Sequence, residues 1–200
     1  MATAIEVLGP PTCIGCRAHG ALLCRSCRLR MPPAPGGPDI GGVRRVLAAW
    51  PYEGAARSLI LELKLRGRRA AAVPLVEAIV REVGRQGLDG EIVTWVPGRR
   101  ADTRRRGFDH AELLARGVSR RLGLRSRDLL SRTSARPDQA GLSAVERRVN
   151  LTGAFESQGC RAPVVLVDDL VTTGATAIAC ASALAAAGVP SVELLVACRA

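Results

Sequence analysis

Residues 164–176 constrain the fold of this 200-residue chain more than any other stretch. They begin with four aliphatic residues, 164–167, which are typical of a strand buried on both faces in a parallel sheet. Two carboxylates, Asp168 and Asp169, follow, and then a threonine-rich turn that contains a glycine. Residues 175–187 are rich in alanine and leucine and run into Gly-Val-Pro, which predicts a helix and its stop signal. The sequence therefore predicts a strand, an acidic pair, a tight turn and a helix.

The turn offers the groups that bind a phosphate. Residues 172–176 provide backbone N–H groups at a predicted helix N-terminus, three threonine hydroxyls, and a glycine that lets a ligand approach closely. Asp168 and Asp169 accept hydrogen bonds only, so they suit sugar hydroxyls or a hydrated magnesium ion. A ribose 5-phosphate unit is the natural ligand of such a site. The alternative is that the two carboxylates merely cap a helix in an ordinary α/β loop.

The whole string resembles the phosphoribosyl-diphosphate signature of the type I phosphoribosyltransferases, which is an apolar strand, two acidic residues and Thr-Thr-Gly-x-Thr. That resemblance implies that Asp168 and Asp169 are the catalytic carboxylates and hold the 2′- and 3′-hydroxyls of the ribose. It also implies that the 5′-phosphate binds the residues of the turn, which are Thr172, Thr173, Gly174, Ala175 and Thr176. The same signature occurs in regulators that bind without reacting, so the motif indicates the ligand more strongly than turnover.

The first thirty residues carry two Cys-x-x-Cys pairs, Cys13 with Cys16 and Cys24 with Cys27. Four thiolates at this spacing can close a tetrahedral zinc site. So short a segment has almost no core of its own, and a structural zinc ion would supply folding energy on the order of 10 kcal/mol or more. Disulfides or a redox dithiol are the alternatives. Since no export signal is recognisable, zinc is favoured.

The predicted fold is α/β, with a mostly parallel sheet, helices on both faces, and the ligand at the carboxyl ends of the strands. We expect a zinc knuckle over residues 1–30, a linker over 31–42, and a phosphoribosyltransferase-like domain over 43–200. The linker contains four prolines and four glycines, which exclude a helix or a central strand. Apolar periodicity further predicts strands over 43–52 and 91–96, and helices over 54–65, 70–85 and 111–122.

Two basic segments are candidates for gripping a diphosphate. Residues 63–69 lie at a predicted helix end, where they could instead satisfy terminal carbonyls. Residues 99–110 carry five arginines without apolar periodicity, which predicts a loop that is mobile until an anion arrives. A solvated run of charges is the alternative there. The diphosphate ligands that we expect are Lys64, Arg66, Arg99 and Arg106, and a further basic cluster lies at Arg147 and Arg148.

The net charge is +11, from 29 basic and 18 acidic residues, which favours phosphorylated ligands or nucleic acid as partners. An aromatic content of 2% argues against sequence-independent binding of single strands, because such binding usually stacks bases on aromatic rings. Arginine stacking could substitute for it. No stretch approaches eighteen uninterrupted apolar residues, so we expect a cytoplasmic protein without membrane insertion.

Four segments occur in the order seen in the ComF family, which also carries N-terminal zinc knuckles, and the resemblance covers nearly the whole chain. It implies a phosphoribosyltransferase-like protein associated with DNA uptake in natural transformation, acting with single-stranded DNA after its entry. The segments are Leu63-Lys64-x-Arg66-Gly67, Arg106-Gly107-Phe108-x-x-Ala111-Glu112-Leu113-Leu114, Gln139-x-Gly141-Leu142-Ser143-x-x-Glu146-Arg147-Arg148-x-Asn150-Leu151 and the Asp-Asp motif.

Two departures from the pattern of that family concern the expected site. Trp95-Val96-Pro97 stands where members usually show Pro-x-Pro, which bears on the shape of the diphosphate loop. Asp109-His110 stands where they often show Asn-Gln. The imidazole of His110 could accept a proton from an incoming nucleophile, or it could be a bystander.

Our hypothesis from the sequence is that the main domain binds magnesium phosphoribosyl diphosphate and can transfer the phosphoribosyl group to a nucleophile with loss of pyrophosphate. The alternative is a non-catalytic accessory that binds single-stranded DNA or partners a DNA-uptake helicase, its phosphoribosyl site being vestigial or a sensor. The sequence selects neither the accepting nucleophile nor an oligomeric state.

Overall fold

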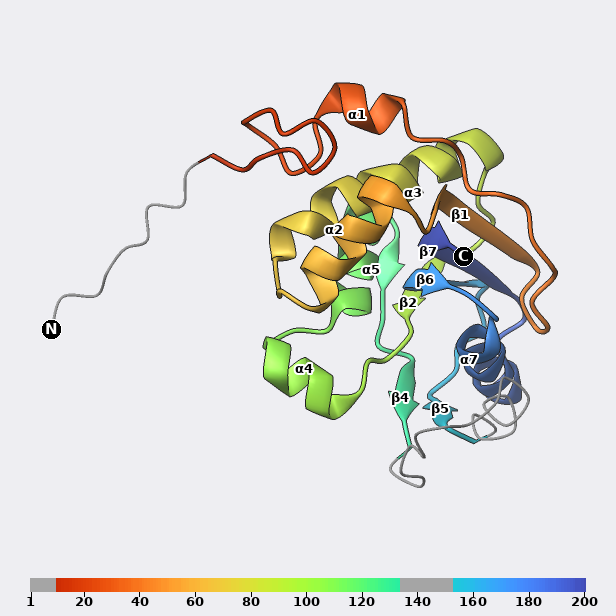
Figure 1. Ribbon diagram of the computed structural model, residues 1–200. Helices are drawn as coiled ribbons and strands as arrows, with labels where there is room; N and C mark the ends of the chain where they lie inside the picture. Colours follow the sequence, from red (N-terminus) through yellow and green to blue (C-terminus); the bar gives the residue numbers. More distant parts are fainter. Residues whose placement is uncertain (1–9, 134–152) are drawn as a thin grey trace, which may run out of the picture.

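The computed structural model describes residues 10–133 and 153–200 of the chain (Figure 1). A five-stranded sheet lies at its centre, with the strand order β1-β7-β6-β2-β3 and parallel pairing throughout. Its strands are β1 (Arg45–Pro51), β2 (Ile92–Trp95), β3 (Arg125–Ser126), β6 (Val164–Val171) and β7 (Val192–Arg199). A separate antiparallel pair consists of β4 (Leu130–Arg132) and β5 (Phe155–Ser157).

Helices cover both faces of this sheet. Figure 1 shows α7 on the opposite side from α2 and α3. The helices are α1 (Arg25–Leu29), α2 (Gly54–Lys64), α3 (Ala72–Gln86), α4 (Arg100–Arg106), α5 (His110–Leu122) and α7 (Ala175–Ala186), with a short 3-10 turn at Arg69–Ala71. The predicted fold class, a mostly parallel α/β sheet with helices on both faces, is confirmed.

Alternation along β6 divides the core in two. Val165 and Val167 belong to an apolar cluster that includes side chains of α2, α3 and α5. Val164 and Leu166 belong to the cluster under α7. Successive side chains leave a strand on opposite faces, and a central parallel strand must bury both of them, so an uninterrupted aliphatic run is what this position requires.

The N-terminal segment packs on the same core as the main sheet. Leu22 and Leu23 are buried in the cluster that holds α2 and α3. Arg28 of α1 forms an ion pair with Glu77 of α3, and Arg121 of α5 reaches the same carboxylate at 3.4 Å. Apolar and charged contacts therefore both join the cysteine-bearing segment to the rest of the protein.

The prediction of a loop over 99–110 is wrong, because residues 100–106 form helix α4. Arginine is a good helix former, so the charge run is compatible with a helix even without an apolar stripe. Gly107, at φ 74°, ends α4, and the Asp109 side chain caps α5 by accepting from the N–H groups of Ala111 and Glu112. The basic cluster at Arg147 and Arg148 lies outside the described residues.

Candidate functional site

The acidic pair lies within β6 and not after it, since the strand continues to Val171. Asp169 is 1% exposed and faces the side of α2 and α5, where Lys64 Nζ lies 2.8 Å from its Oδ2 and His110 Nε2 lies 3.3 Å from its Oδ1. Asp168 faces the α7 side, where it lines a small cavity beside the turn. Strand alternation therefore gives the two carboxylates different surroundings.

The turn after β6 leads directly into α7. Gly174 is the N-cap of that helix and has φ 74°, a left-handed conformation that suits glycine. The cavity at the turn measures about 60 Å³, and its lining includes Asp168 and residues 170–177. Thr172 and Thr173 are exposed. The structure thus brings Asp168 together with all five residues of the predicted phosphate turn at the N-terminus of a twelve-residue helix, where the first N–H groups have no partner within the helix.

Asp169 belongs to a closed ring of four side chains that come from four elements. Lys64 of α2 and His110 of α5 both contact it, Arg106 Nη2 lies 3.3 Å from His110 Nδ1, and Arg106 Nη1 donates to the backbone oxygen of Lys64 at 3.4 Å. Since a guanidinium only donates, Nδ1 of His110 must accept, and the ring proton sits on Nε2 and is donated to Asp169. His110 therefore connects the acidic pair to the arginines of α4.

The two carboxyl groups titrate in opposite directions. Burial raises the pKa of Asp168 well above its usual range, and the negative charge of Asp169 raises it further. Burial also acts to raise the pKa of Asp169, but the hydrogen bond from His110 and the charge of Lys64 hold that pKa below its usual range. Burial acts to lower the pKa of Lys64, and the charge of Asp169 outweighs this and raises it. Asp169 is therefore the permanent anion of the pair.

Two of the four predicted diphosphate residues come together near Asp169, since Lys64 pairs with it and Arg106 contacts His110 and the backbone oxygen of Lys64. Arg66 does not join them, because its exposed guanidinium pairs with Glu62 one helical turn earlier in α2. Glu62 is buried and also lies 3.4 Å from Arg68. Arg99 is exposed and precedes α4 as its N-cap residue.

Sequence reasoning did not single out Glu62, although its i,i+4 spacing to Arg66 is a recognisable signal. It weighed His110 without assigning it. It also missed Ile40, which packs on the turn and which no local pattern in a proline-rich segment would reveal.

The four N-terminal cysteines also come together, with sulfur atoms within 4.8 Å of one another. The N–H of Cys24 donates to Cys13 Sγ at 3.3 Å, and Cys16 and Cys24 lie 3.6 Å apart at sulfur. Gly15 makes room for the cluster, because a Cβ there would lie 2.8 Å from Cys27 Sγ.

Electrostatics in the cluster also suit a metal. Burial acts to raise the pKa of Cys13, but backbone N–H groups that include that of Cys24 outweigh it and hold that pKa at about 6. Burial and the facing thiols raise the pKa of Cys27 to about 12. Four sulfur donors in one small volume, one of them readily ionised, fit the tetrahedral zinc site that the spacing predicts.

The carboxylates of β6 are hard oxygen donors of the kind that magnesium prefers. Oxygens of Asp168 and Asp169 and a ring nitrogen of His110 lie within 4.8 Å of one another. Lys64 already pairs with Asp169, so Asp168 is the carboxylate of the two that is better placed to hold a cation.

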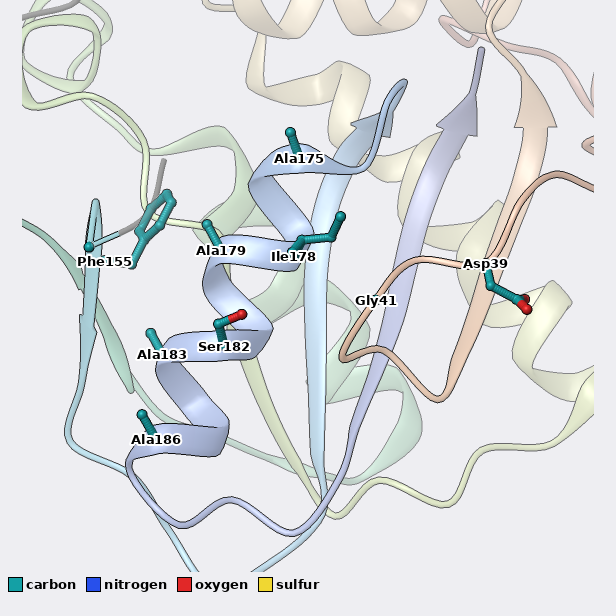
Figure 2. A pocket seen from close by; sticks show the side chains of 10 residues that line it. Asp39, Gly41, Phe155, Ala175, Ile178, Ala179, Ser182, Ala183 and Ala186 are labelled. Atoms are coloured by element: carbon teal, nitrogen blue, oxygen red, sulfur yellow. The ribbon is translucent and has the colours of Figure 1, made fainter. Parts of the chain in front are cut away.

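A larger cavity, of about 580 Å³, lies along the outer side of α7 (Figure 2). Small residues of α7 line it together with Phe155 and residues of the segment before β1, among them Asp39 and Gly41. Apart from Ala175 it shares none of the residues of the acidic pair and turn. In the part of the chain that the structure describes, no helix is both long enough and apolar enough to cross a membrane.

No family model matches the chain. DNA utilization protein YhgH of Salmonella typhimurium is 31% identical to it, over 94% of this chain and 83% of that protein. YhgH of Escherichia coli K12 is 32% identical over the same shares. Competence protein F of Haemophilus influenzae is 34% identical over 45% of this chain and 42% of its own length. Among solved structures, glutamine phosphoribosylpyrophosphate amidotransferase from B. subtilis aligns with a TM-score of 0.42 and 19% identity, over 62% of this chain and about a quarter (25%) of its own.

Proposed function

Because this chain belongs to the ComF family, together with the YhgH proteins and competence protein F, we propose that it binds magnesium phosphoribosyl diphosphate at the carboxyl end of β6 and serves DNA uptake. The observation that supports the ligand best is the adjacency, in one short segment, of a glycine-capped helix N-terminus and an acidic pair in which Asp169 is buried and Asp168 half-buried. Zinc held by the four clustered cysteines would suit a reducing compartment, so the proposal includes a cytoplasmic location.

In this proposal the 5′-phosphate binds the N–H groups and hydroxyls of the turn, and Asp168 accepts hydrogen bonds from the ribose hydroxyls, with Asp169 beside it. Lys64 and Arg106 meet the diphosphate by exchanging their contacts with Asp169 and His110 for phosphate oxygens. The proposal keeps Arg66 and Arg99, both exposed, as further diphosphate ligands, and Arg66 would exchange its ion pair with Glu62 for a phosphate oxygen. Bound magnesium would neutralise the leaving pyrophosphate.

Transfer, where it occurs, breaks the bond from C1 of the ribose to the diphosphate oxygen and forms a bond from C1 to the acceptor. Pyrophosphate leaves with the bonding electrons, and the acceptor loses a proton. Lys64 and Arg106 would stabilise the charge that develops on the leaving group. Once Arg106 turns to the diphosphate, Nδ1 of His110 is released and can take the proton of the acceptor.

The test is calorimetric titration of the zinc-loaded protein with phosphoribosyl diphosphate and magnesium. We expect micromolar binding by the wild-type protein and none by the Asp168→Asn/Asp169→Asn double variant. Asp168→Asn alone is the cleaner site variant, because Asp169 also pairs with Lys64 and His110. Glu91→Gln changes net charge equally at an exposed position and should leave binding unaltered. Absence of binding by a folded wild-type protein would falsify the proposal.

A second candidate, a single-stranded DNA accessory that contacts a DNA-uptake helicase, is favoured by one surface. Arginines are exposed beside the site, with 75% of the Arg66 side chain and 69% of the Arg105 side chain accessible. Arg69 stacks over Phe108 with 4.8 Å between guanidinium carbon and ring centroid, and it donates to the backbone of Gly107. The segment after α2 and the end of α4 therefore form one basic face.

Anisotropy of a labelled single strand, measured across salt concentrations, tests this candidate. Affinity that falls steeply with salt would show that phosphate contacts dominate, and the Arg104→Gln/Arg105→Gln variant should then weaken binding and reduce the salt slope by roughly two. Arg120→Gln on the exposed side of α5 is the control. Affinity that survives high salt points to stacking instead, and no measurable binding removes the candidate.

A further inference from the structure

The segment before β1, predicted as a linker, packs against the phosphate turn. Ile40 is 5% exposed and belongs to the apolar cluster under α7. Its side chain lies so close to Gly174 that a Cβ on that glycine would sit 2.9 Å from Ile40 Cδ1 and 3.0 Å from Cγ1. Only a glycine leaves space for this contact.

That contact falls on the residue that sets the shape of the turn. Gly174 has φ 74° and is both the last residue of the turn before the helix and the N-cap of α7. A shift of Gly174 moves the first N–H groups of the helix, which are the groups that a phosphate would meet. Ile40 therefore closes the turn from the side away from solvent.

The segment that carries Ile40 is itself anchored at several points. Arg199, the last residue of β7, is 9% exposed and donates from Nη2 to the backbone oxygen of Pro38 at 2.7 Å. Gly37 lies against the same guanidinium, since a Cβ there would be 2.3 Å from Cζ. Gly42 approaches Ala181 of α7, where a Cβ on the glycine would be 3.2 Å away. Figure 2 shows this segment passing beside α7, with Gly41 labelled.

Arg199 also ties the segment to the strand that precedes the turn. It is the register partner of Val171, the last residue of β6, and the N–H of Ala200 donates to Val171 O at 3.0 Å. The chain therefore holds the turn from both ends, through Val171 at its start and through Gly174 at its end.

We propose that residues 37–42 form the back wall of the 5′-phosphate subsite, and that Ile40 and Arg199 are positioning residues which hold the turn in its binding conformation. The proposal rests on the proposed ligand and adds to it an element from outside the motif. It also separates the two anionic subsites, because Lys64 of α2 pairs with Asp169 on the other face of β6 and Arg106 of α4 contacts the backbone oxygen of Lys64 there.

This separation makes a selective effect measurable. Ribose 5-phosphate occupies the turn without the diphosphate residues, pyrophosphate occupies the diphosphate residues without the turn, and phosphoribosyl diphosphate occupies both. A change that loosens residues 37–42 should therefore weaken the binding of ribose 5-phosphate and of phosphoribosyl diphosphate. It should leave the binding of pyrophosphate unaltered. A general loss of protein stability would instead lower the affinity for all three ligands to a similar extent.

The experiment is calorimetry of the zinc-loaded full chain with each of these three ligands and magnesium. For Ile40→Ala and for Arg199→Met we expect affinity for phosphoribosyl diphosphate and ribose 5-phosphate to fall roughly tenfold or more, the scale on which small displacements of binding groups act. Pyrophosphate affinity should change by less than about twofold, a shift that is small beside a tenfold effect. Ile40→Val, which retains a branched side chain over Gly174, should recover most of the loss.

Val189→Ala is the matched control, since Val189 is buried in the same apolar cluster but follows the far end of α7. Three outcomes would each overturn the inference. The first is an equal loss of affinity for all three ligands, and the second is a similar selective loss in Val189→Ala. The third is unaltered affinity in both Ile40→Ala and Arg199→Met. In all three of these outcomes the wild-type protein still binds the ligands. If the proposed function itself is wrong, the wild-type protein binds none of them, and the inference is then wrong as well.

Discussion

Asp168 and Asp169 are adjacent in the sequence and differ in almost every physical respect. Asp169 is enclosed by a lysine and a histidine, while Asp168 accepts a hydrogen bond from the backbone N–H of its neighbour at 2.8 Å. Keeping Asp168 charged therefore costs stability, which agrees with the binding role that we propose for it.

Asp168→Asn should raise the melting temperature of the ligand-free protein at pH 7 to 8. The folded-state pKa of Asp168 is raised, so the stability linked to its protonation is complete below the unfolded pKa near 4 and is lost as pH rises through the folded pKa. The neutral amide avoids this loss, and Asn Oδ1 can still accept from the N–H of Asp169. Scanning calorimetry from pH 4 to 8 checks this, with a gap between variant and wild type that widens with pH. A variant less stable than the wild type at pH 8 would contradict it.

His110 is the second residue whose role depends on its exchangeable protons. His110→Leu should break the ring, lower the melting temperature and weaken pyrophosphate binding, because Asp169 loses a donor and Arg106 loses an acceptor. His110→Gln should retain most of both properties, since its side-chain amide has an N–H that can donate to Asp169 and a carbonyl oxygen that can accept from Arg106. Thermal unfolding and calorimetry of the two variants test this. If His110→Leu and His110→Gln have equal melting temperatures and equal pyrophosphate affinities, the imidazole has no specific role in the site.

At the scale of elements, one cap organises the segment between β2 and α5, which contains α4. Asp109 accepts from Ala111 and Glu112 at the start of α5, and its other oxygen accepts from Gly98 N at 2.7 Å. Gly98 must be a glycine, because a Cβ there would lie 2.7 Å from Asp109 Oδ2. This cap fixes where α5 begins and so where His110 stands relative to β6.

Asp109→Ala should lower the free energy of unfolding by about 1 kcal/mol or more, because it removes the helix cap and leaves Gly98 N without its acceptor. Asp109→Asn should cost less, since an amide oxygen can still cap the helix. Urea unfolding monitored by circular dichroism gives both values. The idea fails if the alanine variant is as stable as the asparagine variant.

At the scale of the whole molecule, the cysteine-bearing segment and the main sheet share one apolar cluster. Cys13, Leu22, Leu23 and Cys27 belong to the same buried cluster as the side chains of α2 and α3. An ion pair from Arg28 to Glu77 crosses the same junction. The zinc knuckle and the phosphoribosyltransferase-like domain, which we proposed as separate units, are therefore expected to unfold together.

Removal of zinc with a chelator should lower the melting temperature of the full chain by roughly 10 °C or more, because binding to the folded state alone stabilises it by mass action. Calorimetry should show a single unfolding transition for the zinc-loaded protein and a single transition at lower temperature for the zinc-free protein. Adding zinc back should restore the higher melting temperature. Two separate transitions, of which only one responds to the chelator, would show that the segment folds independently.

Local patterns predicted much of this protein. The aliphatic run of β6, the helix after Gly174 and the spacing of the cysteines each follow from chemistry within about a dozen residues, where strand period, caps and metal-ligand geometry operate. The same reasoning failed at α4, because an arginine run carries no apolar period although its residues favour a helix.

The sequence by itself therefore determined the class of fold, the acidic strand, the glycine-capped turn after it and the cluster of four cysteines. Only the tertiary structure decided that Asp169 faces Lys64 and His110, that Arg66 is held by Glu62, and that Ile40 backs the turn at Gly174. The physical reason is separation along the chain. Ile40 and Gly174 are more than a hundred residues apart, and such a contact is set by how the sheet and helices pack around a common core and not by any local period.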